Sequence, residues 1–408
     1  MKQKKISWYS FWMIICFLLI PTPIRAEGDL IGPPAEIKIE SHQQGQVSDV
    51  EDVIEYGMNL LDWESIEQLE EELQNAMPQD ISFHLKDAMK QFISGEEKIT
   101  VNNVLTYIGK VLFQEAGVFI QFGARFILIV LLCNLLQTLS SSFKSKDTAK
   151  IGFFVCYMII LLSVVQSFRV MINLATQVID QMVQLMLVCV PILLAFMATS
   201  GFNLSAGAMS PIIISTLSLM AYLIKVIVLP CIISVVVLEM MSVMSEEFKV
   251  TKLVGLFYKG IRWGLRGILM VSVSLLGMYR FVTPGIDLAL KKATVKFSTA
   301  FIPVVGNAVG GTIDFITQGS MIIKNTFSTG IIIWLLILVS IPLIKILSYV
   351  CVYQIAGAMI EPIGDKKMAS IASKLSKGCQ FIMSSVGIVA LFCICSFIIC
   401  MTISATGV

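Results

Sequence analysis

Uninterrupted apolar runs, about as long as a bilayer crossing, dominate this chain from residue 118 onward. A membrane-spanning helix needs about 20 mainly apolar residues in a row. Of the 408 residues, 56% are apolar and 14% are charged, against about 25% charged in a typical soluble domain. We therefore expect an all-α fold, a polytopic transmembrane helical bundle of about seven to eight spans with the lipid bilayer as its solvent.

Charge and hydropathy divide the chain into three parts. Residues 1–26 have a basic start, an apolar stretch and a small residue at Ala26, which indicates a cleaved signal peptide; an uncleaved anchor is the alternative. Residues 27–117 carry 19 acidic and 5 basic side chains, and residues 118–408 carry 21 basic and 9 acidic ones. The pattern predicts an acidic extracytoplasmic segment followed by a multi-span membrane domain.

The acidic segment has helical periodicity in three places. Apolar residues recur every three or four positions over 53–77, and shorter helices are expected over 81–93 and 101–113. These helices predict a small extracytoplasmic domain, too thinly apolar to be stable without a partner surface.

The membrane domain contains several clear candidate spans. We expect them at residues 122–139, 151–168, 182–198, 263–281, 331–352 and 381–403. The run 211–244 is too long for one simple crossing and contains Pro230, so it forms either one long kinked helix or a hairpin of two short ones.

Loop charges arbitrate the orientation, because short cytoplasmic loops collect Lys and Arg. The basic loops 144–150, 249–266 and 366–377 all become cytoplasmic if the run 211–244 crosses twice and residues 282–330 do not cross. This count favours eight crossings, with both the acidic segment and the C-terminus outside.

The stretch 282–330 is unusual for a membrane domain. Its first part, 287–297, is amphipathic and suits the lipid interface. The part that follows is only half apolar and contains Pro303, Gly306, Gly310 and Gly311. Irregular backbone at membrane depth is tolerated only where protein or water surrounds it. This predicts a re-entrant element or a helix packed closely through Gly306 and Gly310, and a surface loop is the alternative.

Charged residues inside spans are costly unless they face protein or water. Lys225 and Lys345 are the best candidates for a polar path across the membrane, with snorkelling to the headgroups as the alternative. Asp314 is a possible partner for either lysine. Asp180 and Glu239 fall near expected segment ends, where snorkelling explains them.

No catalytic motif is recognisable, so an enzyme is the least supported class. Both histidines, His42 and His84, fall in the acidic segment and are expected to be solvated. Cys393 and Cys395 lie in an apolar run and are expected to be small hydrophobic residues in a helix rather than metal ligands. We expect no cofactor or metal, and the dispersed basic residues do not suggest nucleic acid.

Four stretches resemble, in this order, the stage III sporulation protein AE family of endospore-forming bacteria. They are Ile93-Ser94-Gly95-Glu96; Val190-Pro191-Ile192-Leu193-Leu194-Ala195 with Ser200-Gly201, Ser205-Ala206 and Pro211; Phe301-Ile302-Pro303-Val304-Val305-Gly306 with Gly319-Ser320 and Lys324-Asn325; and Glu361-Pro362-Ile363-Gly364-Asp365-Lys366. Each piece is weak alone, but their order, the export signal and the hydropathy together make the resemblance specific.

The resemblance implies a non-enzymatic role in the mother-cell membrane that surrounds the forespore. It implies a permease-like component of a multiprotein channel or secretion-like complex needed for endospore formation. The implied partners are the other proteins of the stage III sporulation assembly, including an ATPase and ring-forming components. An autonomous secondary transporter of a small solute is the rival hypothesis, because transporters build midplane sites from broken helices.

Overall fold

The computed structural model describes residues 63–74, 85–86, 89, 109, 117, 120–132, 135, 146–244, 250–301, 303–362 and 366–403. The chain separates into two compact units, Met1–Ser48 and Asp49–Val408. All described residues belong to the second unit, so the expected signal peptide at 1–26 lies outside them, as do His42 and His84. Within the described ranges the regular structure is helical throughout, which confirms the all-α fold class.

The first long helix, α6 (Lys146–Thr199), joins two of the expected spans into one rod. The expected spans 151–168 and 182–198 are separated by residues 169–181, whose polar side chains lower the hydropathy. This stretch contains neither glycine nor proline, so nothing in it breaks a helix. The interpretation as two crossings was wrong, because polar residues confined to one face do not end a helix.

The run 211–244 is also one rod rather than a hairpin. Helix α7 (Asn203–Leu223) continues through a five-residue π-helical turn, η1 (Ile224–Val228), into α8 (Leu229–Met244). In the π turn the N–H of Leu229 donates to the carbonyl of Ile224. Pro230 has no N–H, and its ring clashes with the carbonyl four residues earlier in a regular helix. The wider turn just before Pro230 accommodates that clash, so the helix continues through the proline instead of reversing.

The stretch 282–330 belongs to two long helices. Helix α9 (Thr251–Phe301) ends just before α10 (Pro303–Ile360) begins. A residue preceding proline is disfavoured in a helix, while proline itself suits the first helical position. The backbone is helical through Gly306, Gly310 and Gly311, so the structure has no broken re-entrant backbone there. Side chains of residues 301–316 lie outside the described set, and close packing through Gly306 and Gly310 stays a prediction.

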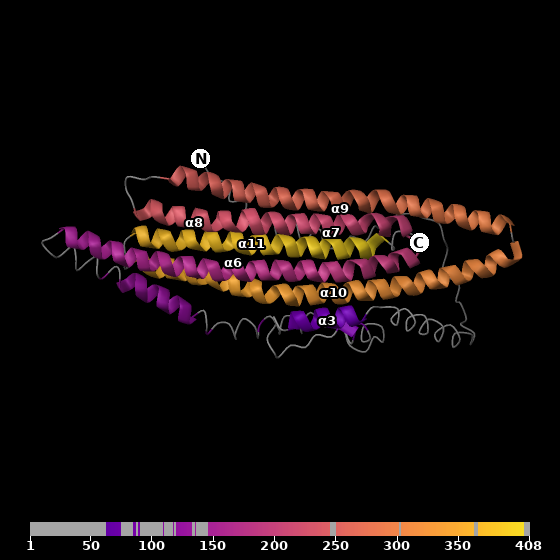
Figure 1. Ribbon diagram of the computed structural model, residues 1–408, viewed down its shortest axis with the longest axis horizontal. Helices are drawn as coiled ribbons and strands as arrows, with labels where there is room; N and C mark the ends of the chain where they lie inside the picture. Colours follow the sequence, from indigo (N-terminus) through magenta and orange to yellow (C-terminus); the bar gives the residue numbers. More distant parts are fainter. Residues whose placement is uncertain are drawn as a thin grey trace, which may run out of the picture. The chain divides into compact units, whose positions relative to one another are not determined.

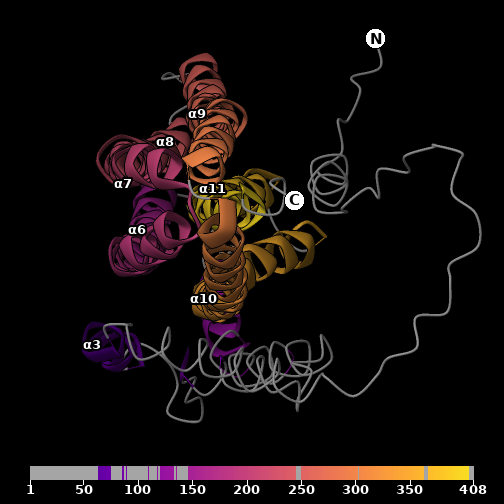
Figure 2. The same ribbon diagram turned by 90° about the vertical axis from the view of Figure 1, so that its right-hand side faces the viewer.

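Helix α11 (Lys366–Ile403) forms the centre of the bundle. It packs against α6, α7, α8, α9 and α10, and an end-on view shows these helices around it (Figure 2). Its small buried residues, such as Ser376, Ser385 and Ser396, let neighbouring backbones approach closely. The hydroxyls of Ser385 and Ser396 donate to carbonyls one turn earlier, so their polarity is satisfied within the helix.

Five helical stretches in the described part of the chain are long and apolar enough to cross a membrane. They are Tyr157–Thr199, Asn203–Ser242, Thr251–Asp287, Thr317–Ile360 and Ser370–Ile403. Successive helices run antiparallel, so the start of α6 and the α8–α9 and α10–α11 connections share one end of the bundle (Figure 1). We call it the basic end, because Lys252, Lys259, Lys366 and Lys374 lie near it in sequence.

A shorter apolar helix, Ile120–Leu132, covers residues 122–132 of the expected span 122–139. It packs on α10, where Phe122 and Phe126 stack edge-on against the ring of Tyr353. A Cβ at Gly123 would lie 3.3 Å from Val352, so glycine permits this close approach.

Described residues of the acidic segment also pack on the long helices. Helix α3 (Trp63–Gln74) contacts α6 and buries Ile66 and Leu69, as its spacing predicts. Leu85 lies so close to Gly330 of α10 that a Cβ there would meet it at 2.7 Å. The Glu70 carboxylate accepts the Leu85 N–H at 2.7 Å, which ties the two parts of the segment together.

Candidate functional site

An ion pair lies halfway along the two apolar rods. The Lys225 ammonium, in η1, pairs with the Asp180 carboxylate of α6. Asp180 is close to the midpoint of the apolar stretch Tyr157–Thr199, and Lys225 to that of Asn203–Ser242. The side chains are 50% and 30% exposed, respectively. The pair therefore reaches the surface of the bundle at mid-height.

The depth of this pair can be judged from α9. Residues 267–279, between Arg266 and Arg280, carry no charge and extend over about 20 Å at 1.5 Å per residue. Arginines at both ends can extend to the headgroups, so this stretch fits a hydrocarbon core of about 30 Å. At its middle, the Ser272 hydroxyl donates to the Met220 sulfur at 3.7 Å. Met220 precedes Lys225 by little more than one turn, which puts the ion pair near the middle of the bilayer.

This geometry revises the interpretation of the charged residues. Lys225 was expected either to line a polar path or to snorkel, and the structure gives it a carboxylate partner midway along the helices; both alternatives stay predictions. Asp180 was interpreted as lying near a segment end, which is wrong because α6 continues through it. The signal that could have revealed it is the absence of glycine and proline from residues 169–181.

The structure does not assign the other two expected polar-path residues, Lys345 and Asp314, to this pair. Lys345 is half-buried on α10, whereas the most extensive contacts of η1 are with α7, α8 and α9, and its ion pair is with α6. Asp314 falls in α10, but its side chain lies outside the described residues. Lys345 and Asp314 therefore stay unassigned to a path.

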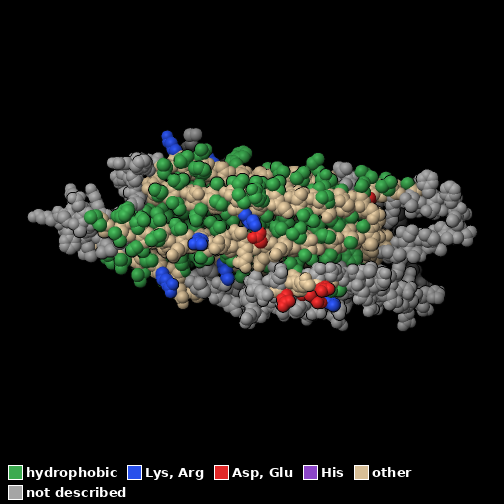
Figure 3. Space-filling view, in the orientation of Figure 1, with side chains coloured by type: hydrophobic (Ala, Val, Ile, Leu, Met, Phe, Trp, Pro, Cys, Tyr) green, Lys and Arg blue, Asp and Glu red, His purple; other side chains and the backbone are tan. Residues whose placement is uncertain are grey.

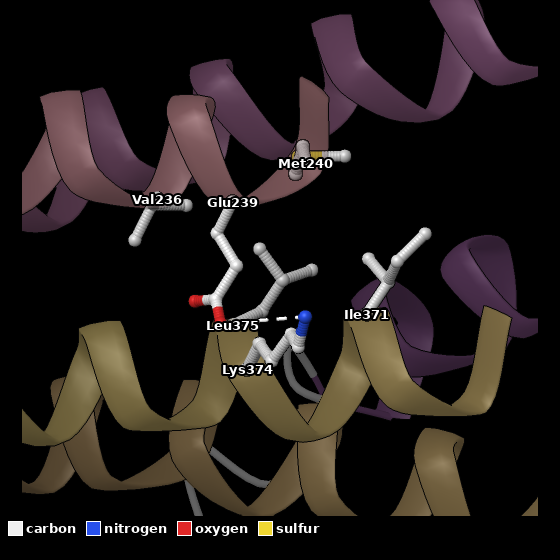
Figure 4. A pocket seen from close by; sticks show the side chains of 6 residues that line it. All are labelled: Val236, Glu239, Met240, Ile371, Lys374 and Leu375. Atoms are coloured by element: carbon white, nitrogen blue, oxygen red, sulfur yellow. Dashed lines mark ion pairs between the residues drawn. The ribbon is translucent and has the colours of Figure 1, made fainter. Parts of the chain in front are cut away.

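A second charged cluster lies near the basic end. The Lys374 ammonium of α11 is 3.5 Å from the Glu239 carboxylate of α8, which also accepts a 2.7 Å hydrogen bond from the Tyr258 hydroxyl of α9. Figure 4 shows Glu239 and Lys374 pointing toward each other across a narrow crevice. The crevice is lined by Val236, Glu239, Met240, Ile371, Lys374 and Leu375. The cluster links three helices and has the character of a structural contact.

Two buried ionisable residues were missed by sequence reasoning. Lys324 is fully buried and donates to the carbonyls of Cys400 and Met401 of α11, at 3.1 and 3.3 Å. Carbonyls near a helix C-terminus have no partner within the helix and attract cations, so Lys324 caps the end of α11. Nothing in the local sequence distinguishes it from the lysines expected at the surface.

Asp287, the second missed residue, caps the N-terminus of α7 in the way that Lys324 caps the C-terminus of α11. It was expected at a lipid interface, but it is only 4% exposed. Its carboxylate accepts the N–H groups of Leu204 and Ser205 at 3.0 and 2.8 Å, and the Ser205 hydroxyl at 2.6 Å. Phe202, at the N-cap, makes no such side-chain bond, so a residue of α9 satisfies the free N–H groups of α7.

Metal chemistry has no support in the described ranges, where no group of three or more His, Cys, Asp or Glu side chains could hold an ion. Cys393 is buried in α11 and Cys395 half-buried.

The bundle and its internal ion pairs define the class as a multi-pass helical membrane protein.

Sequence comparison assigns the chain to a family. A model of the family described as stage III sporulation protein AE matches residues 83–404. Stage III sporulation protein AE of Bacillus subtilis (strain 168) is 30% identical over 322 residues, which cover 78% of this chain and 79% of that protein. The chain belongs to the stage III sporulation protein AE family. No solved structure matches it.

Proposed function

We propose that this chain is the non-enzymatic, permease-like membrane component of a multiprotein channel or secretion-like complex between mother cell and forespore. Membership of the family supports a role in sporulation. The observation that supports a conducting rather than a purely anchoring role is the Asp180–Lys225 pair, which puts charge near mid-membrane at the bundle surface. Charged groups in membrane helices commonly mark the path of a substrate or ion.

The proposed orientation follows from the basic end. With Lys- and Arg-rich connections in the cytoplasm of the mother cell, the α6–α7 and α9–α10 turns and the C-terminus face the space between the two cells. The acidic segment packs on α6 and α10 through α3 and Leu85. On that outer side its acidic surface is available to the ring-forming partners of the assembly, and the ATPase acts from the basic end.

The test measures sporulation in a host whose only stage III sporulation protein AE is this chain. Lys225→Met and Asp180→Asn are each expected to lower the yield of heat-resistant spores without lowering the amount of membrane-integrated protein. The double exchange, Asp180→Lys with Lys225→Asp, is expected to restore part of the yield because it restores the pair. Lys86→Met, at an ion pair of 3.9 Å in the acidic segment, is the matched control. Normal spore yield from Lys225→Met contradicts the conducting role.

The assembly itself is tested by affinity purification of the full chain from sporulating cells. We expect an ATPase and ring-forming proteins to co-purify after engulfment. Purification of the chain alone, at the stage when it is needed, contradicts the complex.

The second candidate function is an autonomous secondary transporter of a small solute. The π turn that carries Lys225 favours it, because transporters use helix irregularities at the midplane for binding. The uninterrupted helix from Pro303 onward removes the other irregularity on which this hypothesis rested. Full activity in cells that lack every co-purifying partner would favour the transporter.

A further inference from the structure

The outward face of α6 is polar where a lipid-facing helix is apolar. Six exposed positions follow one another along this face, and we call them the α6 polar stripe. They are Gln166, Arg169, Asn173, Gln177, Asp180 and Gln184. Figure 3 shows the side of the bundle on which α6 and α7 face the viewer, with few charged side chains among hydrophobic and other surface.

The spacing of the stripe is that of a straight helix face. Steps of three and four residues average the 3.6 residues of one turn, so the six side chains lie above one another. From Gln166 to Gln184 the stripe extends about 27 Å along the helix, close to the thickness of the hydrocarbon core, about 30 Å. It contains Asp180, whose pair with Lys225 lies near mid-bilayer. With Asp180 near mid-bilayer, Gln184 lies about 6 Å beyond the middle and Gln166 about 21 Å before it. The stripe therefore covers the half of the membrane nearer the basic end, from the middle to the headgroups.

Lipid cannot satisfy these groups. Each amide offers two donors and an acceptor, and a polar group left unpaired in hydrocarbon is costly. In the described part of the chain, Asp180 is the one member of the stripe with a hydrogen-bond or ion-pair partner. A surface of suitable polarity must cover the other members at membrane depth.

The chemistry of the stripe matches a second stripe of the same kind. Its four amides (Gln166, Asn173, Gln177 and Gln184) are donors and acceptors at once, so an identical face can pair with it. The Asp180 charge is already neutralised by Lys225, so no oppositely charged partner is required. Copies of one chain insert with the same orientation, which brings two α6 helices side by side at equal depth around an axis along the membrane normal.

We propose that the α6 polar stripe is the contact through which two copies of this chain associate in the membrane, α6 against α6. Arg169 is compatible with this pairing, because helical side chains lean toward the N-terminus. That direction leads from Arg169 toward the basic end, and its long side chain can reach the headgroups there. The inference does not depend on the proposed function, because association is measured without reference to sporulation.

Photo-crosslinking between two differently tagged full-length copies tests the proposal. A photoreactive p-benzoylphenylalanine replaces Gln166, Gln177 or Gln184, one at a time, in membranes containing both copies. Met270 and Met278, which are 71% and 65% exposed on α9, are the matched control positions. We expect a product carrying both tags from the stripe positions and none from the α9 positions.

Any other pattern overturns the proposal. If the stripe positions crosslink to a different protein and give no product with both tags, another partner covers the stripe. Absence of every product, or equal products from α6 and α9, shows that the stripe faces lipid or water, or that copies collide at random.

A second variant removes the contact instead of probing it. Replacing all four amides by Leu is expected to weaken co-purification of the two tagged copies by about fifty-fold, the effect of a few interhelical hydrogen bonds. Met270→Leu with Met278→Leu should leave co-purification unchanged. Unfolding temperature shows whether both variants are folded, and undiminished association of the folded four-amide variant contradicts the proposal even if crosslinks form.

Discussion

The outer faces of α6 and α9 differ in the polarity of the side chains that they expose. Helix α9 exposes large apolar side chains, among them Trp263, Met270 and Met278. Its Tyr258 and Asp287 point inward, where Tyr258 donates a hydrogen bond to α8 and Asp287 accepts hydrogen bonds from α7. Helix α6 exposes amides and charges at the same depth. Lipid is a good solvent for the first face and a poor one for the second. Exposure in an isolated bundle therefore separates a lipid-facing surface from one that needs a protein or water neighbour.

The largest effect should come from placing a charge on each face in turn. Met270→Asp is expected to destabilise the membrane-embedded fold by about 3 kcal/mol, the cost of Asp at the centre of a membrane helix. Gln177→Asp should cost far less, because its surroundings are already polar. The amount of folded protein extracted from membranes, measured by size-exclusion chromatography, distinguishes them. Equal losses would remove the distinction between the two faces.

A smaller effect should come from crowding the inner side of the bundle. A Cβ at Gly378 of α11 would lie 2.6 Å from Val236 and 2.8 Å from the ring of buried Phe168 of α6. Gly378→Ala should therefore lower the free energy of unfolding by about 2 kcal/mol. Gly267→Ala on α9, where nothing lies within 4 Å, should change it by less than about 0.5 kcal/mol. Thermal unfolding in one detergent compares the two, and a stable Gly378→Ala variant would mean that the helices are packed less closely.

Removing the inward carboxylate of α9 should have a somewhat smaller effect. Asp287→Ala leaves the N–H groups of Leu204 and Ser205 without their acceptor, and the expected loss is about 1.5 kcal/mol. Asp287→Asn keeps an acceptor oxygen and should lose less than half of that. Hydrogen exchange at the start of α7 measures the loss locally. Unchanged protection in Asp287→Ala would show that another group caps this helix.

The smallest effect should follow from deleting one hydroxyl. Tyr258→Phe removes the 2.7 Å hydrogen bond to Glu239 but keeps the Lys374–Glu239 pair, so about 1 kcal/mol is expected. Glu239→Gln, which also removes the ion pair, should cost more. Thermal unfolding of both variants and the double variant gives the coupling between them. If Tyr258→Phe proved the more harmful, the ion pair would not stabilise the cluster.

Sequence patterns captured the class of fold and the grouping of the basic connections at one end of the bundle better than the number of spans. Two expected extra crossings, one within α6 and one in the run 211–244, are absent. Because they are two, the basic connections still lie together at one end of the bundle (Figure 1). Both errors came from equating a fall in hydropathy, or a proline, with a chain reversal. A polar face and a π turn each interrupt the hydropathy or the regular helix without ending the rod.

The candidate site was predictable only in part, because pairing depends on three-dimensional neighbours. Lys225 was recognisable from its place in an apolar run, whereas its partner Asp180 is 45 positions away in the sequence. Lys324 and Asp287 owe their burial to helix ends supplied by α11 and α7. No local pattern around either residue encodes such a contact.

The π turn also determines which face of α8 points toward the centre of the bundle. One additional residue in a turn rotates the next segment by about 100° relative to a regular helix. Helix α8 therefore presents Glu239 toward Lys374 of α11, although α7 and α8 form one rod. Deleting one residue from 224–228 would leave the rod apolar and nearly as long. It would nevertheless rotate α8, so that the Glu239 carboxylate could no longer reach Lys374.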